Sequence, residues 1–145
     1  MQIKYLITAC FFICGTAVYC IASVESEAVT ARTKAMSEIS DNMRFLGFML
    51  KGKTDFDLDS AKLAIENIAK LAAQAPGLFE IETADPHAEA KPEIWSNYED
   101  FVEKALTLQA VAIAASNSLV SEEGLKDVMM AMGKTCKSCH SLYRN

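Results

Sequence analysis

The sequence predicts an all-α protein, an antiparallel four-helix bundle formed by one domain of the 145-residue chain. Four segments carry apolar residues three and four positions apart, the spacing that lines one face of an α-helix. No segment alternates between apolar and polar residues over the length of a strand, and no Asn-Gly or Asp-Gly pair marks a hairpin turn. Amphipathic helices of this kind bury their apolar faces by packing around a common core.

The four helices differ in how clearly the sequence marks their ends. Asp57 and Ser121 are N-cap residues, and each stands directly before an apolar pattern. Pro76, Gly77 and Pro86 interrupt the pattern in the middle of the chain. We therefore expect helices at about residues 25–51, 58–74, 92–119 and 122–143.

The connections between these segments determine the order of the helices. Residues 52–56 form a short link, so the first two helices should be antiparallel neighbours. Residues 75–91 form the long crossover loop, and residues 117–121 a tight turn.

The first 22 residues have the composition of a secretory signal peptide. Lys4 is their only charge, an apolar run extends from Tyr5 to Ala22, and Ala22 before Ser23 suits cleavage. We expect a leader at 1–22, a bundle domain at 23–145 and a periplasmic location, with no stable membrane insertion after cleavage. The run is also long enough to span a bilayer, so an uncleaved N-terminal membrane anchor is the alternative.

The net charge of the chain limits the kinds of macromolecule that it is expected to bind. Fourteen basic and nineteen acidic residues give a formal charge of −5, which disfavours nucleic acid and anionic membranes. A basic docking patch on a partner protein fits this balance.

The chemistry of the chain is concentrated near its C-terminus, in Cys136-Lys137-Ser138-Cys139-His140. This C-x-x-C-H box is the attachment signal for c-type haem, whose vinyl groups add two thiols as thioethers and whose iron takes the histidine as ligand. The two cysteines lie on the apolar stripe of the fourth helix, and positions three and four apart share a face. The box therefore predicts one covalent haem c per chain, inside the bundle. The other three cysteines fall within the leader.

Two other interpretations of the cysteine pair are weaker. A zinc site needs four ligands, and only a remote His87 could join Cys136, Cys139 and His140. A thioredoxin-like pair follows a strand, which this sequence lacks.

Two residues of the first helix could reach the haem. Arg32 lies in its apolar stripe, where a charge either extends to solvent or pairs with a haem propionate. Met36, one turn later on the same face, is either core filling or the sixth iron ligand.

The chain resembles the class II c-type cytochromes, the cytochrome c′ and c-556 group, over essentially the whole mature part. The terminal box with Tyr143-Arg144, the pair Arg32 and Met36, and the segment Lys91-Pro92-Glu93-Ile94-Trp95 carry the resemblance. In high-spin cytochromes c′ the residue four after the arginine is typically apolar, and the five-coordinate iron binds NO or CO. In low-spin c-556 members it is a methionine that ligates iron. The resemblance therefore implies axial ligation by His140 and Met36, with Arg32 at a propionate or the haem edge.

These observations predict a periplasmic cytochrome that carries single electrons between redox partner proteins and is not an enzyme. The alternative is a five-coordinate protein that binds small gases. Peroxidase-like chemistry is weaker still, because no distal histidine with a partnering acid or arginine is apparent near Met36. Phe45, Phe48 and Met49 widen the apolar surface of the first helix, which indicates either a homodimer face or a broader core stripe.

Overall fold

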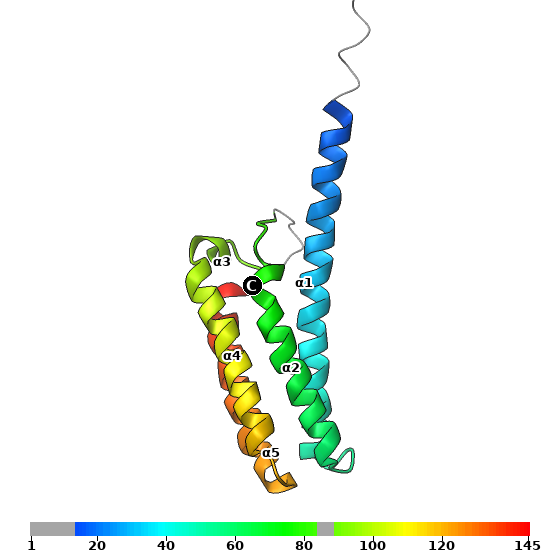
Figure 1. The fold of residues 1–145 in the computed structure, drawn as a ribbon, viewed down its shortest axis with the longest axis vertical. Helices are drawn as coiled ribbons and strands as arrows, with labels where there is room; N and C mark the ends of the chain where they lie inside the picture. Colours follow the sequence, from blue (N-terminus) through cyan, green and yellow to red (C-terminus); the bar gives the residue numbers. More distant parts are fainter. Residues whose placement is uncertain (1–13, 84–88) are drawn as a thin grey trace, which may run out of the picture.

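The computed structural model describes residues 14–83 and 89–145, with side chains from residue 27 onward. Within these residues it contains no strand, only an isolated bridge between Ala90 and Arg144, which confirms the all-α prediction. The helices form an elongated bundle (Figure 1). Their bounds are α1 Cys14–Leu50, α2 Leu58–Leu78, α3 Glu93–Ser96, α4 Tyr98–Ser118 and α5 Glu122–Tyr143.

The structure describes only part of the predicted leader at residues 1–22. Residues 1–13 are outside the described residues, and α1 begins at Cys14, earlier than the expected start at residue 25. No helix of the described chain combines the length and the hydropathy that crossing a bilayer would take. Leader and anchor therefore both stay predictions.

The first two helices are antiparallel neighbours, as the short link between them predicted (Figure 1). Gly52 ends α1 at a φ of 63°, a left-handed conformation that glycine adopts without a Cβ clash. The amide of Gly52 donates to the carbonyl of Met49, and that of Lys53 to the carbonyl of Phe48. This pair of bonds satisfies carbonyls at the helix end and turns the chain towards α2.

The start of α2 matches its prediction and its end does not. Asp57 caps the helix by accepting a hydrogen bond from the amide of Ser60. We expected the helix to stop at about residue 74, before Pro76, but it continues to Leu78. A proline costs a helix one amide bond, and here the last turn compensates. The amide of Phe79 donates to the carbonyls of Ala75 and Pro76, and the hydroxyl of Tyr98 also donates to that of Pro76.

The prediction of a single helix at 92–119 is wrong, because the chain forms two helices there. Asn97, at φ −129° and ψ 44°, separates the short α3 from α4. Its amide closes α3 on the carbonyl of Glu93, while its own carbonyl accepts the amide of Phe101. The indole of Trp95 donates to the carbonyl of Phe79 at 2.8 Å, which holds α3 against the end of α2.

The fourth expected helix, 122–143, is confirmed as α5. Ser121 stands at the N-cap with extended backbone, but its side chain bonds the carboxylate of Glu123 instead of a backbone amide. Ser121 therefore takes the predicted N-cap position, but its side chain does not make the hydrogen bond to a backbone amide that usually accompanies that position.

The core has two parts. A large cluster from all four long helices fills most of the bundle, and a small one of Phe79, Ile94, Phe101 and Tyr143 closes the end where α5 finishes. Among neighbouring long helices, α1 and α5 contact each other least. They approach at Gly47, where the methyl carbon of Met129 lies 3.7 Å from the position a Cβ would take. Phe45 and Phe48 are exposed on α1, whereas Met49 is buried and belongs to the core.

Leu46 is the position where the large cluster is most sensitive to truncation, since its side chain is fully buried. Replacing Leu46 with alanine should lower the free energy of unfolding by about 2–5 kcal/mol through lost transfer energy and a residual cavity. The matched control is Leu63→Ala on α2, whose side chain is 60% exposed, and which should change stability by less than about 0.5 kcal/mol. Urea unfolding of both variants measures the difference, and equal losses would contradict the packing.

Candidate haem site

The C-x-x-C-H box occupies the last two turns of α5. The thiols of Cys136 and Cys139 are both half-buried and unpaired with each other, and His140 is more exposed. Cys139 packs against the small cluster at the closed end of the bundle. His87 lies outside the described residues. No three His, Cys, Asp or Glu side chains come together as a metal-ion site anywhere in the described part of the chain.

Two neighbouring cavities open between α1 and this end of α5. One has a volume of about 350 Å³ and includes Arg32, Phe79 and Tyr143 in its wall. The other, of about 300 Å³, extends towards Met43, Leu108 and Cys136. Both are lined largely by apolar side chains, and they share part of their walls. The residues common to both are Met36, Phe101, Cys139, His140 and Arg144.

These residues fit a covalently bound haem. A porphyrin is flat and apolar, and the space beside α5 is apolar and extends to both sides of Cys139 and His140. The two thiols stand at its border, where vinyl groups could be attached. An imidazole and a thioether, both known iron ligands, line the same space from α5 and α1.

Burial sets the protonation of the three groups in the box. It raises the pKa of the Cys136 thiol, and that of Cys139 to about 11. It also lowers the pKa of His140, and the neighbouring charge of Arg144 lowers it further. In the unmodified chain the thiols are therefore protonated at neutral pH. The imidazole is neutral and keeps a nitrogen lone pair available to a metal.

Met36 lies on α1, on the far side of the cavities from α5. Its side chain is half-buried and packs against both core clusters. It is thus placed where the large core ends and the cavities begin. Sequence reasoning singled out this residue, and the structure brings it to the same space as His140.

Arg32 lies in the interior and is bound there by protein groups, while its contact with a haem propionate stays a prediction. It is 4% exposed, so it does not extend into solvent. Its guanidinium donates to the carbonyl of Leu78, the last residue of α2, and to the carbonyl of Ile81 and the hydroxyl of Thr83 in the segment that follows. It also lies over the ring of Phe79, at 4.9 Å from the centroid. A guanidinium has five N–H donors, so these three bonds leave two unused, and Arg32 is part of the wall of the larger cavity.

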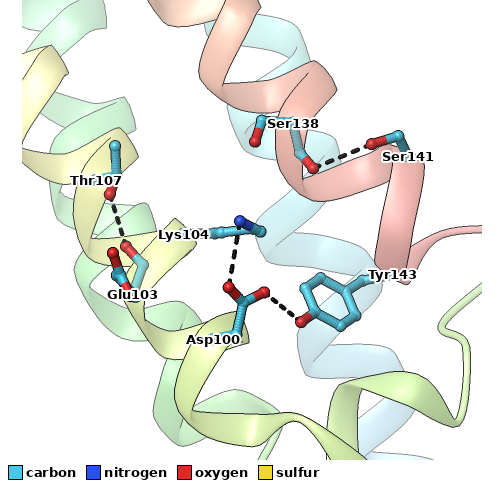
Figure 2. A network of polar contacts seen from close by, with 7 residues as sticks. All are labelled: Asp100, Glu103, Lys104, Thr107, Ser138, Ser141 and Tyr143. Carbon is cyan, nitrogen blue, oxygen red and sulfur yellow. Dashed lines mark hydrogen bonds and ion pairs between the residues drawn. The ribbon is translucent and has the colours of Figure 1, made fainter.

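A polar network joins α4 to the end of α5, and sequence reasoning missed it. The hydroxyl of Tyr143 donates to Asp100 at 2.5 Å, and the second oxygen of Asp100 pairs with Lys104 at 3.3 Å (Figure 2). The Tyr143 ring stands edge-on to Phe101. The hydrogen bond from Tyr143 lowers the pKa of Asp100. The network fixes the wall of the larger cavity directly after the haem box.

The crossover segment holds the C-terminus from the other side. The amide of Lys91 donates to the carbonyl of Tyr143 at 3.0 Å, and the amide of Asn145 to that of Glu89 at 2.9 Å. Arg144 and Glu89 form an ion pair at 2.5 Å. The last turn of α5 is therefore fixed to α4 and to the crossover segment.

The Tyr143 bond predicts a pH-dependent contribution to stability. Burial, with the hydrogen bond to Asp100, raises the pKa of Tyr143 from its ordinary value near 10 to about 12. The fold favours the neutral phenol, so the contribution is complete below about pH 10 and is lost as the pH rises to about 12. The advantage of the parent protein over Tyr143→Phe should therefore shrink across that range. Urea midpoints of both proteins measure it, because other titrating groups cancel. A difference that stays constant to pH 12 would contradict the bond.

Comparison with known proteins identifies the family. The family model described as "Cytochrome C'" matches residues 27–144. The cytochrome c-556 of Agrobacterium fabrum is 32% identical, over 99% of this chain and 97% of that protein. The cytochrome c′ of Pararhodospirillum photometricum is also 32% identical, over 80% of this chain and 94% of its own length.

A solved structure shows the same fold. Cytochrome c prime from Shewanella frigidimarina superposes with a TM-score of 0.74 at 28% identity, covering 83% of this chain and 96% of that one. The bundle, the box at the end of α5 and these relatives agree, and the chain belongs to the cytochrome c′ family and carries covalently bound haem c.

Proposed function

We propose that the protein is an exported electron carrier whose haem is attached at Cys136 and Cys139 and ligated by His140 and Met36. The observation that carries the proposal is that Met36 from α1 and His140 from α5 line the same two cavities. A ligand is thereby available from two of the helices that border the space, α1 and α5. The relatives named cytochrome c-556 agree with this choice.

Each residue has a distinct part in the proposal. The bound haem supplies a one-electron Fe(II)/Fe(III) couple. Cys136 and Cys139 fix the haem edge to α5, and His140 offers a neutral imidazole. The Met36 thioether favours ferrous iron and raises the potential relative to two nitrogen ligands. Arg32, whose three hydrogen bonds to protein groups leave two N–H groups, would hold a propionate.

The sequence also supports a cellular location and a class of partner for the proposed carrier. The leader at 1–22 directs the protein to the periplasm, where it exchanges electrons with redox proteins. Phe45 and Phe48 are exposed on α1 and offer a face for a second copy of the chain.

The second candidate is a five-coordinate protein that binds NO or CO. The similarity to cytochromes c′ supports it, and it requires that Met36 stay off the iron.

Visible absorption of the reduced protein, with and without carbon monoxide, distinguishes the two functions. The proposed carrier gives a low-spin, six-coordinate spectrum that carbon monoxide leaves unchanged. A high-spin spectrum that shifts on addition of the gas would remove Met36 from the iron and favour the second function.

A further inference from the structure

The charge of this chain is unevenly distributed. From Gly124 to the C-terminus there are four basic residues and one acidic residue, whereas the rest of the chain has ten basic and eighteen acidic residues. The whole of α5 carries three lysines and three acids, but the charged side chains after Asp127 are all basic, so the end of the helix that carries the haem box is positive in a protein whose net charge is negative. The net charge suggested a basic partner, but the charge next to the haem has the opposite sign.

The positive residues of α5 form a stripe that the solvent can reach. Lys126, Met130, Lys134 and Lys137 are all exposed, and Met130 is exposed by 57%. They are spaced four, four and three residues apart, which places them along one face of the helix. Lys137 lies between the two cysteines of the box, so this lysine stripe ends at the proposed haem attachment.

The lysines of the stripe keep their charge for an external partner. The ion pairs found within the described residues involve other side chains, so Lys126, Lys134 and Lys137 are not neutralised in this way. Lys134 borders a surface groove of about 440 Å³ between α4 and α5, where Glu103 is the acidic residue and Lys104 adds positive charge. On α5 itself the acids are near its start, at Glu122, Glu123 and Asp127.

We propose that the lysine stripe is the docking surface for a redox protein with a carboxylate-rich patch. The inference rests on the proposed electron-carrier function and names the chemistry of its partner. Complementary charge accelerates encounter and orients it. An acidic patch on the stripe would bring the partner to the solvent side of the helical turn that holds Cys136 and Cys139. Met130 gives the stripe an apolar contact among its lysines, as interface centres usually have.

The test compares two variants with equal changes in net charge. Lys134→Glu with Lys137→Glu reverses the haem end of the stripe. Lys62→Glu with Lys70→Glu is the matched control on α2, which packs against α1 and α4 instead of α5. An electrode coated with a carboxylate-terminated monolayer serves as the acidic surface, and an amine-terminated one as its opposite. At about 0.01 M salt the Debye length of roughly 30 Å leaves the attraction unscreened.

The haem of the parent protein should exchange electrons directly with the carboxylate surface. Reversing the charge of the stripe should lower that signal by about tenfold or more, while the control variant on α2 should keep the parent signal. Equal signals from the two variants, or a parent protein that responds only on the amine surface, would overturn the proposal. Binding to anionic phospholipid vesicles that is lost in the stripe variant, without an electrode difference, would assign the stripe to a membrane and also overturn it.

The spectra keep the two proposals separate. Unchanged absorption of both variants shows that their haem sites are intact. Failure of the electron-carrier proposal appears as carbon monoxide binding by the parent protein, whereas failure of docking appears in the electrode and vesicle measurements without carbon monoxide binding.

Discussion

Replacing Met36 with alanine should turn a reduced protein that ignores carbon monoxide into one that binds it. Removal of the thioether leaves one face of the iron without a ligand and adds space to both cavities that Met36 lines. The spectrum should change from low-spin to high-spin, and the reduction potential should fall because the ligand that favours ferrous iron is gone. Absorption spectra with and without the gas, and a redox titration, measure these changes.

Two further variants separate ligation from packing. Met36→Leu keeps most of the apolar volume without the sulfur, and it should behave like the alanine variant. Met43→Ala removes a half-buried methionine from the same helix and from the wall of the smaller cavity. It should leave spin state and gas binding unchanged. A Met36→Leu protein with the parent spectrum would make Met36 a packing residue.

The second large effect concerns haem attachment. Serine at both Cys136 and Cys139 should abolish covalent attachment, because a hydroxyl does not form the thioether. Acidified acetone should then extract all haem from the variant and none from the parent protein. A single replacement should leave haem attached by the other cysteine.

Ser138→Ala is the matched control for attachment, since it changes an exposed position inside the box without altering the spacing. Its haem should resist extraction. Haem that stays bound to the double-serine variant under the same conditions would show that another residue holds it.

Much of the fold could be predicted because helical periodicity is a local property of the chain. The bounds of α5 and the Asp57 cap depend on neighbouring residues, and both were correct. The break at Asn97 could not be predicted, because apolar residues continue at helical spacing through it and the change of direction depends on the contact of Trp95 with Phe79. The continuation of α2 past Pro76 likewise depends on bonds in its last turn and from Tyr98.

The site shows the same division between local and distant information. The haem box is contiguous, and Met36 follows Arg32 by one helical turn, so both were visible in the sequence. The partners of Arg32 were not, because they are mostly backbone carbonyls more than forty residues away. The bond between Tyr143 and Asp100 joins residues 43 positions apart and has no local pattern. Long-range polar contacts of this kind become evident only in the folded chain.

Proton NMR of the ferrous protein, labelled with ¹³C at its methionine methyl groups, tests the central proposal most directly. A methyl held over the porphyrin centre is shielded by the ring current. The proposed ligation predicts one methionine methyl far upfield of the others among the six methionines that follow the leader, and its loss in Met36→Leu. Methionine methyls that all remain in their ordinary range, or a shifted resonance that persists in Met36→Leu, would contradict ligation of the iron by Met36.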